Sequence, residues 1–199
     1  MKKILISPEC IRNNAFKIAS ELHKSGFFPT KIYAVMRGGA YMAIPISEYF
    51  YRIQDSTEKP FVFGTITARS YISVGKKRAV EIVGWSPALT SIEENDRIII
   101  AEDIVDTGDT LEKILKEIEK LGYDRNKDLQ KPICERNLIV VVHDFKVKCF
   151  EKIKFVPDIY AQEWNIESSE NDVWLHYLTH ELIGLEDDEI KGMYGVDIT

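Results

Sequence analysis

Residues 98–111, with the sequence IIIAEDIVDTGDTL, constrain the fold of this chain more than any other segment. The segment opens with four apolar residues, which is typical of a strand buried on both faces of a parallel sheet. Acids follow at Glu102, Asp103 and Asp106, and a Thr-Gly-Asp-Thr turn at residues 107–110 leads into a helical pattern. Backbone N–H groups at such a helix start can bind a phosphate, and the neighbouring acids can bind hydroxyl groups or hydrated Mg²⁺.

Strand and helix patterns alternate along the chain, which predicts an α/β fold with a central parallel sheet flanked by helices. In the first predicted helix, at residues 8–25, Ser7 fits as the N-cap, and the apolar face comprises Ile11, Ala15, Ile18, Ala19 and Leu22. The other predicted helices cover residues 40–52 and 111–121. Besides the run at residue 98, strands are predicted at residues 31–35, 61–66, 79–83, 138–142, 159–163 and 172–178, with a polar tip at 75–78 and a surface loop at 123–136.

Composition narrows the class of protein. The net charge is −6 and the basic residues are scattered, which argues against a nucleic-acid-binding surface. The cysteines, Cys10, Cys134 and Cys149, lack C-x-x-C spacing, so we expect free, buried thiols in a reducing cytosol. No stretch approaches the ~20 apolar residues of a membrane span. These features predict a soluble, cytoplasmic protein.

The run at residues 98–111 resembles the ribose-phosphate signature of the type I phosphoribosyltransferases: an apolar run, two acids, two apolar residues, then Asp-Thr-Gly-x-Thr. Two positions depart from it, since Glu102 replaces a commoner Asp and Asp109 occupies a variable position. We expect the Asp109 side chain to point away from a bound phosphate, which it would repel. The alternative interpretation is a buried strand with a capped helix and solvated acids.

The resemblance covers roughly residues 4–180 and implies Mg²⁺ and phosphoribosyl diphosphate as cofactor and cosubstrate. Glu102 and Asp103 would bind the ribose hydroxyls and Mg²⁺, and Asp106 would handle the proton at N7 of a base. The residues implied to hold the 5-phosphate are Thr107, Gly108, Asp109, Thr110 and Leu111.

Arg37-Gly38-Gly39 lies between a predicted strand and a predicted helix. Two glycines allow close approach of a ligand, and a guanidinium can bind diphosphate. The corresponding loop of the family binds diphosphate, and the resemblance implies a cis Met36–Arg37 peptide. Ser70 and Tyr71 resemble the pair in the family's mobile loop, which closes over the reaction centre, although an ordinary hairpin with an exposed tip explains them equally well.

The tail resembles the hood of the 6-oxopurine phosphoribosyltransferases. The resemblance implies that Lys146, or its competitor Lys148, bonds the purine oxygen, and that Trp174 stacks on the base. Leu175 would offer backbone groups to the ring edge. A core position for Trp174 is the alternative. The chain departs from the family after this Trp, where Leu-Thr-His-Glu replaces a Pro-Trp-acid run, and Glu181 would supply an acid for a second Mg²⁺.

The resemblance implies a single phosphoribosyltransferase domain over residues 1–199. Its core would cover about 26–145, and its hood would comprise the N-terminal segment and about 146–182. Family members also form dimers or tetramers, so a homodimer or homotetramer is expected.

The resemblance assigns no role to three histidines, His143, His176 and His180. His143-Asp144 follows a predicted strand and could be catalytic, but no nucleophile partner is evident in the sequence. His176 and His180 are four residues apart, and we expect two surface histidines rather than a metal site, because the region reads as a strand and a turn.

These features favour an enzyme that transfers ribose 5-phosphate from phosphoribosyl diphosphate to N9 of a 6-oxopurine, which is guanine, xanthine or hypoxanthine. One alternative is a non-catalytic regulator of the same fold that senses phosphoribosyl diphosphate or a nucleotide. The other is a phosphoribosyltransferase for a pyrimidine or another acceptor.

Overall fold

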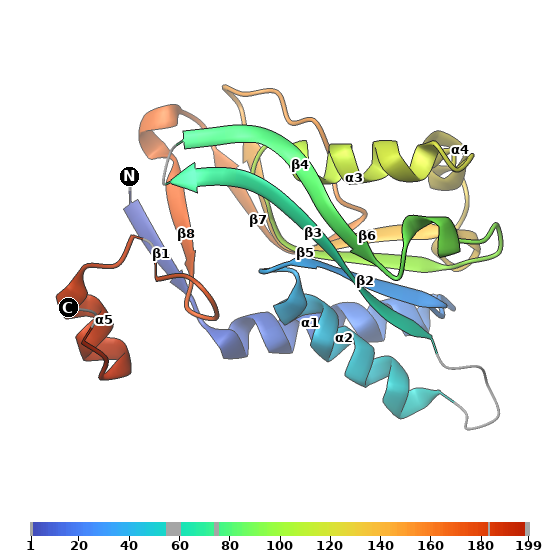
Figure 1. Cartoon of the computed structure of the whole chain (residues 1–199), viewed down its shortest axis with the longest axis horizontal. Coiled ribbons are helices and arrows are strands. Elements are labelled where there is room, and N and C mark those ends of the chain that lie inside the picture. Colours follow the sequence, from blue (N-terminus) through green and yellow to red (C-terminus); the bar gives the residue numbers. More distant parts are fainter. Residues whose placement is uncertain (1, 55–60, 74–75, 183, 198–199) are drawn as a thin grey trace.

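The structure is a computed structural model that describes residues 2–54, 61–73, 76–182 and 184–197. Its central sheet has six strands in the order β4-β3-β2-β5-β6-β7, with all neighbours parallel except the antiparallel pair β3–β4 (Figure 1). This arrangement confirms the predicted α/β class. The bounds are β2 (Lys31–Met36), β3 (Val62–Ser73), β4 (Lys76–Ser86), β5 (Ile98–Val105), β6 (Leu138–Lys148) and β7 (Ile159–Ile166).

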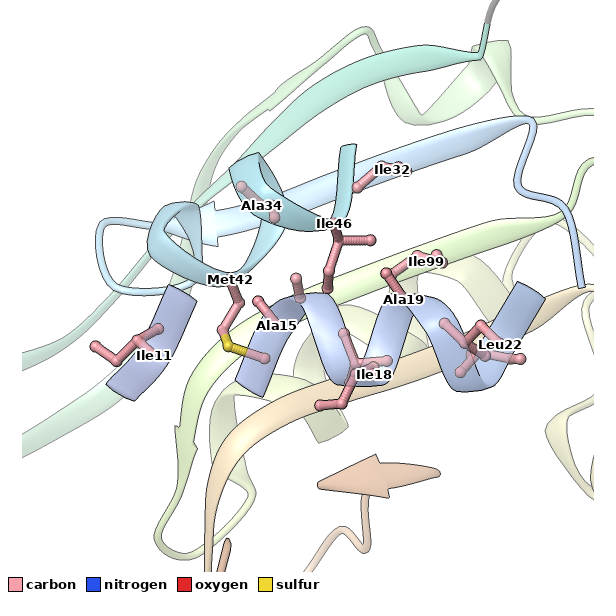
Figure 2. Packing of buried hydrophobic residues seen from close by; sticks show 14 of the residues in the cluster. Ile11, Ala15, Ile18, Ala19, Leu22, Ile32, Ala34, Met42, Ile46 and Ile99 are labelled. Carbon is pink, nitrogen blue, oxygen red and sulfur yellow. The ribbon is translucent and has the colours of Figure 1, made fainter. Parts of the chain in front are cut away.

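Helices cover both faces of this sheet. α1 (Pro8–Lys24) and α2 (Ala40–Ile53) lie on one face, and α3 (Asp109–Glu119) and α4 (Arg125–Leu129) lie on the other (Figure 1). The Ser7 side chain accepts a hydrogen bond from the Cys10 backbone N–H and caps α1, as predicted. The five residues predicted for the apolar face of α1 are its buried residues, and they pack against α2 and the sheet (Figure 2).

The central strand β5 contributes to a hydrophobic core on each face of the sheet. Ile99 packs with α1 and α2, whereas Ile100 packs with α3. Simple alternation would place the later even-numbered residues with Ile100. Instead Ile104 packs against the α1 side and Val105 against the α3 side. The alternation therefore shifts by one residue between Ala101 and Ile104, where the two adjacent acids lie.

A second, two-stranded sheet lies beside the carboxyl ends of the central strands, at the end of the molecule that the β3–β4 hairpin also reaches (Figure 1). It pairs β1 (Lys2–Ile6) in parallel with β8 (Val173–Tyr177), and Lys2 is opposite Val173. α5 (Asp187–Tyr194) follows. The sequence analysis did not predict β1 or α5. A five-residue strand that buries only Ile6 fully carries too weak a pattern to be identified alone.

The β3–β4 hairpin is longer than predicted. Residues 76–78, which were assigned to a polar tip, belong to β4, and Gly75 lies outside the described residues. The ends of a strand are difficult to predict from the sequence when its side chains alternate between solvent and a face that is only partly covered.

Residues 123–136 are not the irregular loop that was predicted. They contain α4 and a 3₁₀ turn at Ile133–Glu135. Asp124 caps α4 by accepting from the Lys127 backbone N–H, and the buried Asp128 accepts from the backbone N–H groups of Asn137 and Leu138. Polar residues thus form structure here by bonding the backbone. α3 also begins two residues earlier than predicted, at Asp109 rather than 111.

The expectation of buried thiols is wrong. Cys10 and Cys134 are half-buried, Cys149 is exposed, and all three are free. Among the helices in the described ranges, each is too short or too polar to traverse a lipid bilayer.

Candidate active site

The loop that follows β2 is in direct contact with strand β5. The Met36–Arg37 peptide that opens this loop is cis, as the resemblance implies. A Cβ on Gly38 would lie 1.8 Å from Asp103 Oδ2, and one on Gly39 would lie 2.2 Å from the Ala101 carbonyl oxygen. Both distances are far below contact distance, so a side chain at Gly38 would require Asp103 or the loop to move, and one at Gly39 would require the backbone to move. The exposed Arg37 side chain stands beside them.

The acid pair occupies the end of β5. Glu102 is buried, and its carboxylate accepts from the Asp103 backbone N–H at 3.1 Å. Burial, together with the negative charge of Asp103, raises the pKa of Glu102 well above its ordinary value. Asp103 Oδ2 also lies 3.5 Å from His180 Nε2. Adjacent carboxylates that repel each other are a donor set suited to a hard divalent cation, which would offset the repulsion.

The turn at residues 107–110 connects this acid pair to α3. Gly108 has φ +84°, and a Cβ there would lie 2.6 Å from the Phe155 backbone nitrogen. The Thr107 hydroxyl donates to Asp109 at 2.6 Å, and Lys154 forms an ion pair with the same carboxylate. The segment after β6 therefore packs on the turn and engages the Asp109 charge.

The first residues of α3 differ in exposure. Leu111 is buried in the core beneath α3, so only its backbone can face a ligand. The neighbouring Thr110 is half-buried. The turn and the helix start together present backbone N–H groups and two threonine hydroxyls.

Asp106 lies beside a cluster of buried charges. Its Oδ1 atom is 2.5 Å from Lys148 Nζ and 3.6 Å from Lys146 Nζ. Asp172, which precedes β8, lies 2.9 Å from Lys146 and 3.2 Å from Lys148. Burial alone would lower the pKa of Lys148, but the ion pairs with the two aspartates raise it above its ordinary value. The same lysines lower the pKa of Asp172 despite its burial.

Lys146 and Lys148 differ in how many acceptors already surround their ammonium groups. Lys146 donates to the Val173 carbonyl oxygen at 2.5 Å and to Asp172, with Asp106 beyond ordinary hydrogen-bond length. Lys148 is within 3.5 Å of three carboxylates, those of Asp106, Asp172 and Glu151. An ammonium has three hydrogens, so Lys146 retains more capacity for a ligand. β6 extends to Lys148, well beyond the predicted strand at residues 138–142, and places both lysines on one face.

The small sheet positions the other predicted base-site residues. Trp174 is half-buried in β8, directly after the residue whose carbonyl oxygen binds Lys146. The Leu175 side chain is buried in the core, which leaves its backbone for contact with a ligand. Ser70 and Tyr71 have backbone in β3, but their side chains lie outside what the structure describes.

The interpretation of two surface histidines is wrong. His176 is fully buried in β8, and burial lowers its pKa below the ordinary value. His180 stacks on Tyr41 and Tyr177 with ring centroids 5.5 and 5.8 Å apart. Glu181 lies 3.7 Å from His176, and burial raises the pKa of this carboxyl.

Sequence reasoning missed three residues of the site. Asp172 pairs with both lysines, His180 approaches Asp103, and Phe155 packs on the glycine of the phosphate turn. Asp172 carried a weak signal, because it stands two residues before Trp174 in the segment that resembles a hood. The other two depend on contacts between distant segments.

An α/β sheet with a glycine turn at a helix N-terminus and an acid pair at the carboxyl ends of its strands is typical of the class of open α/β proteins that bind ligands at that edge. The model of the phosphoribosyl transferase domain family matches residues 2–125, and the chain therefore belongs to that family.

A curated relative is similar to the chain in sequence, and solved structures are similar to it in fold. The chain is 24% identical to the hypoxanthine/guanine phosphoribosyltransferase of Methanococcus vannielii over 161 residues, which are 76% of this chain and 78% of that protein. A purine phosphoribosyltransferase from Pyrococcus horikoshii superposes with a TM-score of 0.62 at 21% identity, covering 94% of this chain and 99% of the other. A hypothetical protein from Neisseria gonorrhoeae with bound ppGpp superposes with a TM-score of 0.61 at 17% identity, covering 91% and 90%.

Proposed function

We propose that this protein transfers ribose 5-phosphate from phosphoribosyl diphosphate to N9 of a 6-oxopurine and releases diphosphate, with Mg²⁺ as cofactor. One observation carries the proposal: Asp106 stands directly before the phosphate-binding turn and also contacts the buried lysines that lead to Trp174. Under this proposal a sugar-phosphate site and a site for a flat, polar ring would share one carboxylate. The names of the Methanococcus and Pyrococcus proteins support a purine as the acceptor.

In the ribose-phosphate half, the turn at residues 107–110 and the N-terminus of α3 would hold the 5-phosphate through backbone N–H groups. The ion pair between Lys154 and Asp109 would offset the carboxylate charge near this anion. Glu102 and Asp103 would bind the ribose hydroxyls and, with Glu181 for a second ion, hold Mg²⁺. When bound, Mg²⁺ would neutralise charge on the diphosphate.

At the leaving-group side, the exposed Arg37 would bind the diphosphate through its fork of donors. The backbone of Gly38 and Gly39 would allow the diphosphate to approach closely. Ser70 and Tyr71 would cover the reaction centre, because a ribosyl centre with developing positive charge must be kept from water.

In the base half, Asp106 would accept or donate the proton at N7, which is general acid–base work worth ~10²–10⁴ in rate. Lys146 would donate to the 6-oxo group, and an amino group at that position offers no acceptor to an ammonium. Trp174 would stack on the ring, and the backbone of Leu175 would bond its edge.

We also infer from family membership that the enzyme acts in the cytoplasm as a homodimer or homotetramer. The ligands are small molecules, and the acidic net charge agrees with the absence of nucleic acid among them.

A panel of free bases tests this proposal. Purified protein is incubated with phosphoribosyl diphosphate and Mg²⁺, and diphosphate release is followed with guanine, xanthine, hypoxanthine, adenine and uracil. Release with a 6-oxopurine but not with adenine or uracil, and its loss when a chelator removes Mg²⁺, is the expected result. Tight binding of phosphoribosyl diphosphate without turnover of any base would instead support the regulator, and turnover of uracil alone would overturn the purine assignment.

A further inference from the structure

Strand β6, which lies between β5 and β7, contains a pair of buried polar residues that the proposed reaction does not use. His143 and Asp144 are both fully inaccessible to solvent. Burying a histidine and a carboxylate side by side is costly unless their polar atoms are bonded. The hydrogen-bond partners of His143 and Asp144 therefore indicate the role of this pair.

Asp144 fixes the tautomer of His143. His143 Nδ1 lies 2.6 Å from Asp144 Oδ2, and a carboxylate can only accept, so Nδ1 carries the proton. The same carboxylate accepts from Trp164 Nε1 and from the Tyr177 hydroxyl, each at 2.7 Å. The imidazole is therefore held with its other nitrogen, Nε2, as an acceptor, which the Asn14 amide approaches in this structure.

His143 Nε2 faces the first turn of α1, where it meets a thiol. Cys10 Sγ lies 3.8 Å from Nε2, and Asn14 Nδ2 lies 3.1 Å from it. The sulfur is also approached by two amide donors, Asn14 Nδ2 at 3.6 Å and Gln162 Nε2 at 3.5 Å. The histidine for which the sequence showed no nucleophile thus has one, supplied by a residue 133 positions away.

Two side-chain amides and the N-terminal turn of α1 lie around the sulfur. Amide N–H groups stabilise a thiolate, and a helix N-terminus adds a positive dipole end, which α1 provides over 17 residues. An imidazolium formed on His143 would be paired with the Asp144 carboxylate. A nucleophile, a base and a group that orients the base form the general arrangement of an activated side chain.

We propose that Cys10 is a nucleophilic thiol, activated by His143 and Asp144, and a site of covalent modification by low-mass disulfides. The Cys10 proton passes to His143 Nε2 in place of the Asn14 hydrogen bond, and Sγ attacks one sulfur of the disulfide. The S–S bond of the reagent breaks, a mixed disulfide forms on Cys10, and the departing thiolate takes the proton back from His143. The exchange requires no oxidant besides the disulfide.

The chain contains its own controls for this proposal. Cys149 is exposed, whereas Cys10 and Cys134 are half-buried. The backbone carbonyl oxygen of Cys134 accepts a hydrogen bond from Arg97. Accessibility alone predicts that Cys149 reacts first. Activation by His143 predicts the opposite order.

The test uses the full chain and 5,5′-dithiobis(2-nitrobenzoate) in excess, with samples quenched by acid over time and mapped by mass spectrometry. We expect Cys10 to be modified at least about tenfold faster than Cys149, the scale of rate differences that thiol activation produces. Equal rates, or faster reaction of Cys149, would overturn the proposal.

A second measurement isolates the role of His143. In a Cys134→Ser, Cys149→Ser background, His143→Gln should slow modification of Cys10 about tenfold or more, because glutamine cannot accept the proton. His143 is buried, so Gln162→Ala, at a half-buried position, provides a variant that does not disturb the core, and it should slow the reaction several-fold. An unchanged rate in folded His143→Gln protein, or in Gln162→Ala protein should His143→Gln not fold, would contradict the proposed activation.

Discussion

The Asp103 carboxylate occupies the space that a side chain on Gly38 would need, with Oδ2 1.8 Å from the position of a Cβ. This contact holds the Arg37-Gly38-Gly39 loop, which we propose binds diphosphate, and Asp103, which we propose binds Mg²⁺, in one geometry. In Gly38→Ala, the carboxylate or the loop must move. Because a displacement of about 1 Å near the reacting atoms can cost ~10²-fold in rate, we expect turnover to fall by about that factor.

We also expect Gly38→Ala to lose ~1–3 kcal/mol of unfolding free energy through overpacking, as measured by urea denaturation. The matched control is Gly84→Ala in β4, where an added Cβ meets no atom within 4 Å. It should leave both turnover and stability nearly unchanged. Equal behaviour of the two variants would show that the contact does not constrain the site.

Asp106→Asn tests proton handling at the base. The amide keeps the shape of the side chain but cannot take up a proton, so we expect kcat to fall ~10²–10⁴-fold with little change in the KM for phosphoribosyl diphosphate. Asp172→Asn is the control, because it removes the other carboxylate that pairs with the same lysines. If both variants lose kcat equally, the role of Asp106 is to pair with lysine rather than to handle the proton.

Exchange of each lysine for glutamine distinguishes Lys146 from Lys148 as the purine ligand. A hydrogen bond to a charged group is worth ~1.5–3 kcal/mol, so Lys146→Gln should lower kcat/KM for the preferred 6-oxopurine about 10- to 150-fold. Lys148→Gln should affect the KM of the base less, because three carboxylates already surround this ammonium. A larger effect of Lys148→Gln on base KM would reverse the assignment.

Acidification should expose the contribution of Asp172 to stability. Lys146 and Lys148 lower its pKa below 3.8 in the folded state, so its contribution is complete above pH 3.8 and is lost as the pH falls through the folded-state pKa. The free energy of unfolding should therefore decrease more steeply below about pH 4 in the wild type than in Asp172→Asn. The exposed Glu119→Gln serves as the control, and it should retain the wild-type slope. Parallel slopes in all three proteins would exclude the ion pairs as a source of acid sensitivity.

Local patterns in the sequence were sufficient where one element determines its own structure. The five buried residues of α1 and its Ser7 cap follow from helical spacing and from a hydroxyl before Pro8. The apolar opening of β5 predicted a strand between two cores for the same reason. The prediction of an irregular loop failed where polar residues bond the backbone, as Asp128 of α4 does.

Contacts between distant segments could not be read from the sequence. His143 and Cys10 are 133 residues apart, and no spacing rule connects them. Asp172 precedes β8, which pairs with β1 in the small sheet and not in the central one. This placement brings Asp172 to both lysines of β6. The acids of the signature could be identified because they lie within five residues of one another in the sequence. The remainder of the site depends on how the two sheets are arranged.

The Tyr177 hydroxyl and the Lys146 ammonium both cross from one sheet to the other, to Asp144 and to the Val173 carbonyl oxygen. Separating the sheets would break both hydrogen bonds and expose the surfaces between the sheets to water. We therefore expect the small sheet to unfold together with the central one. The indoles of Trp164 in the large sheet and Trp174 in the small one should report a single, shared thermal transition.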